Sequence, residues 1–239
     1  MLSYSGLDAA MIRELLIYLL DERRLKIGRV VIEAYSIGAV SRSALRDYRL
    51  FNDAPPGLKR RILAVLDREG MLDWRRLFEL LVLGGNEQLL TAPILNPLVI
   101  DPGSFRGSYR GKIASGLSRE TFRGLEREIP PEVKADLDPK QRAAWEDILS
   151  VVRQRHLNAV FVEVPMPATV TSTPAVAGAR RQLSALLASH GFRYVDLSDE
   201  GRFDAREPAL FTDWKHLSSE GRALYSKAFI EWVREGSEG

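Results

Sequence analysis

The sequence predicts an α/β protein built on a doubly wound parallel sheet, with a mostly helical or irregular insertion. Three short apolar runs rich in β-branched residues predict strands at 29–35, 158–164 and 192–197, a pattern typical of strands buried on both faces. Helical patterns alternate with these runs, and this alternation favours parallel β-α-β units. We therefore expect a single domain over residues 1–239, interrupted by an insertion or lid at about 36–138.

Amphipathic helices are expected wherever apolar residues recur every three or four positions. This spacing occurs in six segments, at 8–24, 58–67, 74–83, 141–155, 174–190 and 217–234. Gly191 is expected to end the fifth helix, because glycine readily adopts the left-handed backbone that follows a helix. Ser218 or Ser219 is expected to cap the start of the last helix with its hydroxyl group.

Composition excludes several classes of site. The chain has no cysteine, which rules out disulfides, thiolate zinc sites, iron–sulfur clusters and a cysteine nucleophile. Its 3 histidines are too few for a histidine-rich metal site, and we expect neither a metal nor a cofactor. The 34 basic and 32 acidic residues leave a net charge of +2, so we expect no nucleic-acid partner. Without a signal peptide or a bilayer-length apolar run, the chain as given is expected to be soluble.

Two of the expected strands carry a carboxylate among apolar residues, namely Glu33 and Glu163. A carboxylate buried without a partner is energetically costly. Each of the two is therefore expected to pair with an arginine or to approach the functional site.

The strongest functional signal lies between the last strand and the last helix. Asp213 and His216 are three residues apart there, a spacing that lets the carboxylate bind one imidazole nitrogen and fix the tautomer. The other nitrogen of His216 can then face a cleft as a general base. In an open parallel sheet, sites form beyond the carboxyl ends of the strands, where this segment is expected. The alternative is a surface histidine beside a turn-forming aspartate.

The residues that follow the pair extend the pattern, with Leu217 next and Gly221 inside the first turn of the helix. Together, Asp213, His216, Leu217 and Gly221 resemble the closing motif of the SGNH, or GDSL-like, hydrolase superfamily. The resemblance is to the branch of alginate-type O-acetyltransferases and D-alanyl-transfer proteins. It implies a flavodoxin-like three-layer αβα fold and a Ser-His-Asp mechanism, in which His216 takes the proton of the serine and Asp213 orients His216. Residues 2–6 resemble the family's second block, which implies that the N–H of Gly6 lines the oxyanion hole.

The family's nucleophilic serine precedes that second block. The resemblance therefore implies that the first strand, the nucleophile and the first helix are missing here, through N-terminal truncation or a start codon placed too late. By the same resemblance, the full-length protein is extracytoplasmic or membrane-anchored. Ser5, which precedes Gly6 and a helix, and Ser104 are the alternative nucleophiles in this chain. Asn86 is the alternative second oxyanion donor, although Gly84 and Gly85 before it also fit the end of a helix.

The resemblance implies an O-acyl esterase or O-acyltransferase that acts on a surface or exopolysaccharide carbohydrate. It also implies an acyl-ester substrate and a membrane-bound acyl-transfer partner. With its nucleophile segment missing, the chain alone is expected to be inactive, or nearly so, on an activated acetyl ester. The alternative is a non-catalytic carbohydrate-binding or assembly module that retains the fold.

Overall fold

The computed structural model describes residues 9–34, 36, 54–68, 70, 72–74, 77, 116–131, 133–163 and 165–236. They belong to two compact units of the chain. Among the described residues, the first unit holds the helices near the N-terminus and the part of one later helix from Ala143 on. The second unit holds all three strands and the remaining described helices.

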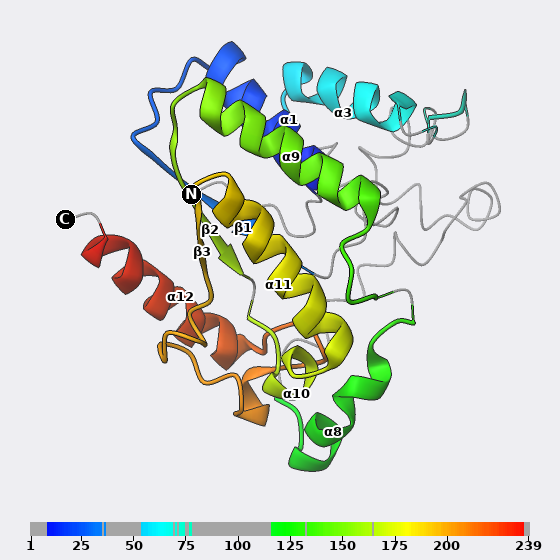
Figure 1. Ribbon diagram of the computed structural model, residues 1–239, viewed down its shortest axis with the longest axis vertical. Coiled ribbons are helices and arrows are strands. Elements are labelled where there is room, and N and C mark those ends of the chain that lie inside the picture. Colours follow the sequence, from blue (N-terminus) through cyan, green and yellow to red (C-terminus); the bar gives the residue numbers. More distant parts are fainter. Residues whose placement is uncertain are drawn as a thin grey trace, which may run out of the picture. The chain divides into compact units, whose positions relative to one another are not determined.

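The described elements of the first unit are helical. Helix α1, Ala9–Ile17, continues into a π-helical turn η1, Tyr18–Glu22, and α3 spans Pro56–Arg68 (Figure 1). Arg61 of α3 binds both N-terminal elements, because its Nε donates to Glu22 at 2.8 Å and its Nη1 to Glu14 at 3.3 Å. The predicted helices at 8–24 and 58–67 are thus confirmed as helical segments.

The helix expected at 141–155 is α9, Pro139–Gln154. Its apolar side chains Trp145, Ile148, Leu149 and Val152 are all buried. Most of the helix expected at 74–83 lies outside the described residues.

The second unit is built on a three-stranded parallel sheet in the order β1-β2-β3. Strand β1 spans Arg29–Ala34, β2 spans Asn158–Glu163 and β3 spans Arg193–Val195, so each predicted strand is confirmed within a few residues. In the register, Val160 of β2 lies between Val31 and Arg193 of its neighbours. The chain is therefore a mixed α/β protein with a small parallel sheet.

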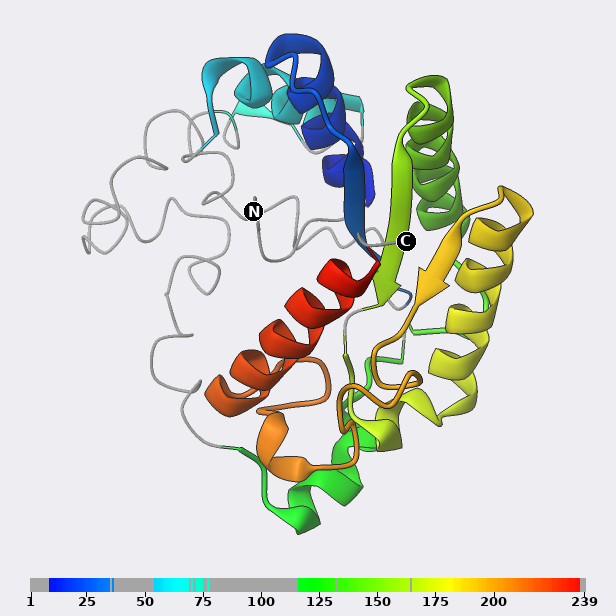
Figure 2. The ribbon, with the colours of Figure 1, turned by 90° about the vertical axis from the view of Figure 1, so that its left-hand side faces the viewer.

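Helices α11, Pro174–Ser189, and α12, Ser219–Glu235, cover this sheet. Figure 2 shows them on opposite sides, α11 in yellow and α12 in red. The N–H of Gly191 bonds the end of α11, and its φ of +80° confirms the predicted left-handed glycine. Ser218, one of the two expected caps, caps α12.

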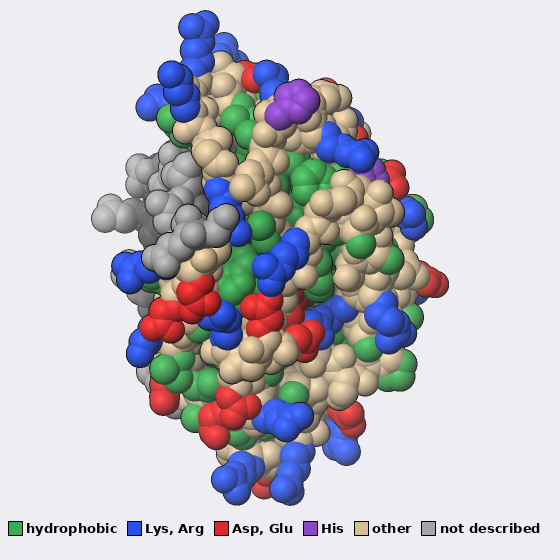
Figure 3. Space-filling model, turned by 60° about the vertical axis from the view of Figure 1, so that its left-hand side comes forward, with side chains coloured by type: hydrophobic (Ala, Val, Ile, Leu, Met, Phe, Trp, Pro, Cys, Tyr) green, Lys and Arg blue, Asp and Glu red, His purple; other side chains and the backbone are tan. Residues whose placement is uncertain are grey.

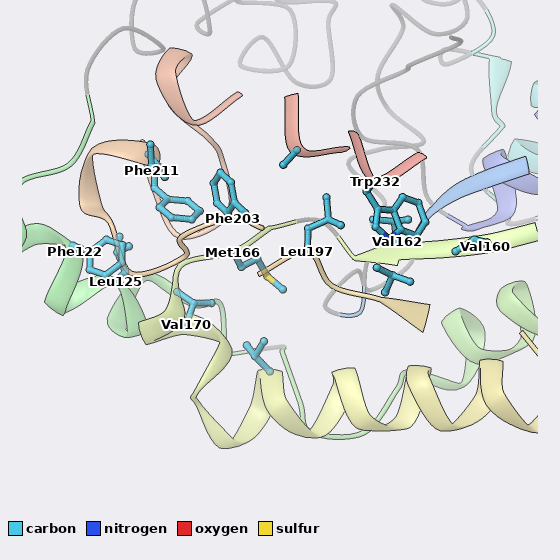
Figure 4. Packing of buried hydrophobic residues seen from close by; sticks show 14 residues of the cluster. Phe122, Leu125, Val160, Val162, Met166, Val170, Leu197, Phe203, Phe211 and Trp232 are labelled. Carbon is cyan, nitrogen blue, oxygen red and sulfur yellow. The ribbon is translucent and has the colours of Figure 1, made fainter. Parts of the chain in front are cut away.

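A hydrophobic cluster of the second unit joins β2 to α12 and extends to α8, α10 and the start of α11 (Figure 4). Val160 and Val162, which alternate along β2, face Trp232 of α12. Farther along the cluster, Phe203 and Phe211 pack edge to face, with ring centroids 6.0 Å apart. Both phenylalanines belong to the long connection between β3 and α12, so this connection is anchored in the core.

Four short elements in the second unit were not expected from the periodicity. They are α8 (Arg119–Gly124), η5 (Leu125–Glu128), α10 (Ala168–Thr171) and η6 (Pro208–Leu210). Each contributes one buried side chain to the core: Phe122, Leu125, Val170 and Leu210. Elements of one or two turns are too short to show a helical repeat, which is why the sequence pattern misses them.

The face shown in Figure 3 carries both positively and negatively charged side chains, with hydrophobic side chains between them.

Candidate functional site

Asp213 and His216 form the hydrogen-bonded pair that the sequence predicts. Oδ2 of Asp213 lies 2.7 Å from Nδ1 of His216. The other carboxylate oxygen, Oδ1, accepts hydrogen bonds from the backbone N–H groups of Lys215 and His216, each at 2.9 Å. The aspartate therefore closes its own tight turn and holds the imidazole ring at the same time.

The hydrogen bonds to Asp213 decide its ionisation. Burial alone would raise the pKa of this carboxyl group, but the bonds from the ring of His216 and from the two backbone N–H groups outweigh burial and lower it. The ionised form is thus favoured, and an ionised acceptor at Nδ1 places the ring proton there. The side chains of Asp213 and His216 are 35% and 37% exposed, so solvent reaches the pair.

The loop that carries the pair is closed at its base. Phe211 and Leu217 form an antiparallel bridge, and the N–H of Thr212 donates to the carbonyl oxygen of His216 at 2.9 Å. Within the loop, the ammonium group of Lys215 lies 5.3 Å from the ring centre of Trp214. Because Phe211 is fully buried, the bridge connects the exposed pair to the core.

The beginning of α12 packs tightly against the preceding chain. Ser218 accepts a hydrogen bond from the N–H of Gly221 at 3.0 Å and donates one to the carbonyl oxygen of Ala209 at 2.7 Å. A Cβ atom on Gly221 would lie 2.0 Å from the carbonyl oxygen of Leu210. The early glycine of the motif therefore has a steric role, since it lets the helix approach this backbone and so sets the position of the loop before it.

The other residues expected at the site lie outside the described part of the chain. This applies to the expected oxyanion donor Gly6, to the alternative nucleophiles Ser5 and Ser104, and to Asn86. Their positions relative to His216 remain predictions.

A second group of polar side chains lies at the carboxyl ends of the three strands, and we call it the carboxyl-end cluster. Its members are Ser36, Gln141, Glu163, Arg180 and Asp196. Glu163 is the last residue of β2, Asp196 follows β3 directly, and Ser36 lies two residues after β1. Of these residues, the sequence pattern points to Glu163, as a carboxylate inside an apolar strand. It does not show that Arg180 of α11 faces the sheet on the same side as Glu163.

The expectation that Glu163 lies near an arginine is confirmed. Nε of Arg180 lies 4.0 Å from Oε2 of Glu163, while Nη2 of Arg180 binds Asp196. Burial raises the pKa of Glu163 to about 8, although Arg180 and the hydrogen bonds from Ser36 act in the opposite direction. Burial raises the pKa of Glu33 as well, but β1 pairs this residue in register with Val162, so its side chain lies on the opposite face of the sheet from that of Glu163.

The described ranges contain no group of three or more His, Asp or Glu side chains arranged to hold a metal ion. None of their helices combines the length and the apolar character that crossing a membrane requires. Comparison of the chain with protein-family models, with curated proteins and with solved structures finds no match.

Proposed function

We propose that this chain is an SGNH-type domain of an O-acyl esterase or O-acyltransferase that acts on an acylated carbohydrate. The observation that carries the proposal is the 2.7 Å contact between Oδ2 of Asp213 and Nδ1 of His216, in a turn closed by the same carboxylate. In acyl transfer through a serine, an aspartate in this place holds the imidazole in the tautomer that accepts the serine proton.

The position of the pair in the chain supports the proposal. Asp213 and His216 belong to the connection that leaves the carboxyl end of β3, and ligands of open parallel sheets bind beyond those ends. The helices α11 and α12 cover opposite faces of the parallel sheet, an arrangement that supports the proposed doubly wound, three-layer architecture.

The proposed reaction proceeds in two steps. His216 takes the hydroxyl proton of a serine as its oxygen attacks the ester carbonyl, and it then gives that proton to the departing sugar oxygen. Water or an acceptor hydroxyl attacks the acyl-serine in the second step, again through His216. Asp213 stays ionised throughout and stabilises the imidazolium. The N–H of Gly6 is the proposed oxyanion donor, and Ser5 is the first serine to test as nucleophile.

The test measures acetate release from an O-acetylated polysaccharide and from 4-nitrophenyl acetate. Two proteins are assayed: the 239-residue chain, and a version that also includes any residues encoded in frame before Met1. In whichever form is active, we expect His216→Ala to abolish release and Asp213→Asn to reduce it about 10³- to 10⁴-fold. His190→Ala is the matched control and leaves activity unchanged, because His190 lies at the C-cap of α11.

Two outcomes would count against the proposal. Acetate release that survives His216→Ala would show that the pair is not the acid–base group. Polysaccharide binding without acyl transfer in either form would instead support the non-catalytic binding module. Loss of release in Ser5→Ala would identify Ser5 as the nucleophile, and transfer to an added sugar acceptor would separate a transferase from an esterase.

A further inference from the structure

The carboxyl-end cluster contains a buried carboxylate that the proposed reaction does not use. Glu163 is 1% exposed, and Ser36 beside it is equally buried. Within the described part of the chain, one oxygen of Glu163 is hydrogen-bonded: Oε1 accepts from the hydroxyl of Ser36 at 3.2 Å and from its backbone N–H at 3.4 Å. Gln141 supports the same turn, because its Nε2 donates to the carbonyl oxygen of Ser36 at 3.4 Å.

The contact between Glu163 and the nearest cation, Arg180, leaves one atom on each side without a hydrogen-bond partner in the part of the chain that the structure describes. Oε2 of Glu163 and Nε of Arg180 are buried and have no hydrogen-bond partner among the described residues, although they lie 4.0 Å apart. That distance is too long for a direct hydrogen bond, so the guanidinium group gives Glu163 only part of the compensation that a buried anion needs.

Arg180 also binds two other carboxylates. Its Nη2 binds Asp196, and the same nitrogen contacts Oδ2 of Asp199 at 3.2 Å. The contact to Asp199 is the weaker of the two, because the side chain of Asp199 is 73% exposed and competes with water. Three acidic groups therefore share one guanidinium group.

Among the described residues, the charged groups that act most strongly on Glu163 are Arg180 and Asp196, so none of these adds a second cation. On α12, the hydroxyl of Tyr225 donates to the backbone carbonyl oxygen of Glu163 at 3.4 Å, and burial raises the pKa of that hydroxyl, so it stays neutral. On β1, Glu33 is paired in register with Val162 and so lies on the opposite face from Glu163. On α11 and after β3, the charged groups are Arg180, Asp196 and Asp199, already described.

We propose that Glu163 is a proton-operated switch at the carboxyl end of the sheet. With a proton on Glu163, its neutral carboxyl group holds the turn at Ser36 and leaves Arg180 to Asp196 and Asp199. Loss of the proton creates a buried anion, which draws Nε of Arg180 into a direct hydrogen bond and weakens the contact to Asp199. The switch does not depend on Asp213 or His216, so it stands or fails separately from the proposed function.

The burial that raises the pKa of Glu163 to about 8 places the transition in a range that solution experiments reach easily. Three signals report it in the folded protein: the amide of Ser36, the Nε–H of Arg180 and a glutamate side-chain carboxyl carbon. Each is followed by NMR in the ¹⁵N- and ¹³C-labelled full chain between about pH 6 and about pH 10. We expect all three to shift with one common midpoint.

Two variants separate Glu163 from other groups that titrate. In Glu163→Gln the shifts of the Ser36 amide and the Arg180 Nε–H are lost. In Glu231→Gln, which changes an exposed glutamate of α12, both are retained. The proposal is overturned if the Ser36 amide is constant over this range, or if its midpoint survives in Glu163→Gln. If Glu163→Gln fails to fold, the titrations of the wild-type protein decide instead. The proposal is then overturned if the glutamate carboxyl carbon and the Ser36 amide titrate with different midpoints.

Discussion

Replacement of Gly221 by alanine tests whether the start of α12 depends on close backbone contact. The added Cβ would lie 2.0 Å from the carbonyl oxygen of Leu210 and 2.9 Å from its carbonyl carbon. Both are backbone atoms, so no side-chain rotation relieves the overlap, and the helix must move away. The hydrogen bonds from Ser218 to Leu210 and Ala209, at 2.9 and 2.7 Å, would lengthen with it.

Two opposing effects set the magnitude. Alanine is favoured over glycine inside a helix by about 1 kcal/mol. Overpacking typically costs about 1–3 kcal/mol, and a clash with backbone belongs at the upper end of that range. We therefore expect Gly221→Ala to lower the free energy of unfolding by about 2 kcal/mol, because the steric effect exceeds the gain in helix propensity.

The assay is equilibrium unfolding in urea, followed by tryptophan fluorescence and by circular dichroism. Gly124→Ala is the matched control, because Gly124 also lies in a helix, α8, and a Cβ there would meet no atom within 4 Å. We expect the control to be neutral or slightly stabilising. If Gly221→Ala is as stable as the control, the close approach at Leu210 does not hold the helix and the steric argument is wrong.

Three further substitutions test the hydrogen bonds and the burial described above. Ser218→Ala removes the cap of α12 and should cost about 1–2 kcal/mol of unfolding free energy, measured in urea; a change below about 0.3 kcal/mol would contradict the capping role. The pKa of Asp213 is lowered in the fold, so its ionised form stabilises the protein above the unfolded-state pKa, and this contribution is lost as the pH falls through the folded-state value. The stability difference between wild type and Asp213→Asn should therefore shrink between about pH 5 and about pH 2, and a constant difference would contradict the hydrogen-bond assignment. For Glu163 the sign is opposite, because burial raises the pKa from 4.5 to about 8 and the folded state binds the proton more tightly. Stability should fall by up to about 1.4 kcal/mol per pH unit between these values, and Glu163→Gln should flatten the pH profile, whereas a slope unchanged in the variant would contradict the assignment.

The regular elements near the sheet were predictable because their physical causes are local. The β-branched runs of β1 and β2 and the amphipathic spacing of α11 and α12 are properties of consecutive residues. The glycine after α11 and the serine before α12 follow equally local rules, since each satisfies backbone groups within one turn of its own helix. The pairing of Asp213 with His216 was predictable for the same reason, because both atoms lie within one four-residue turn.

The carboxyl-end cluster was not predictable in this way. Glu33 and Glu163 have the same sequence context, as carboxylates inside apolar strands, yet they lie on opposite faces of the sheet and Glu163 is buried beside Arg180. Ser36 and Glu163 are 127 residues apart in the chain, and only the pairing of β1 with β2 brings them into contact. Register decides which face of a strand each carboxylate occupies, and register depends on the whole sheet.

What the sequence determined alone is therefore the α/β character, the three strands, the major helices and the Asp213–His216 pair, all of which depend on periodicity or on contacts within a few residues. The tertiary structure alone decided that Gly221 is needed for a close approach to Leu210. It alone also decided that Glu163 is buried and that its Oε2 has no hydrogen-bond partner among the described residues. The contacts of Arg180 with Glu163, Asp196 and Asp199 likewise depend on the tertiary structure. These features arise where segments distant in the chain are brought together, and the free energy of a buried charge depends on those neighbours rather than on the residues adjacent in sequence.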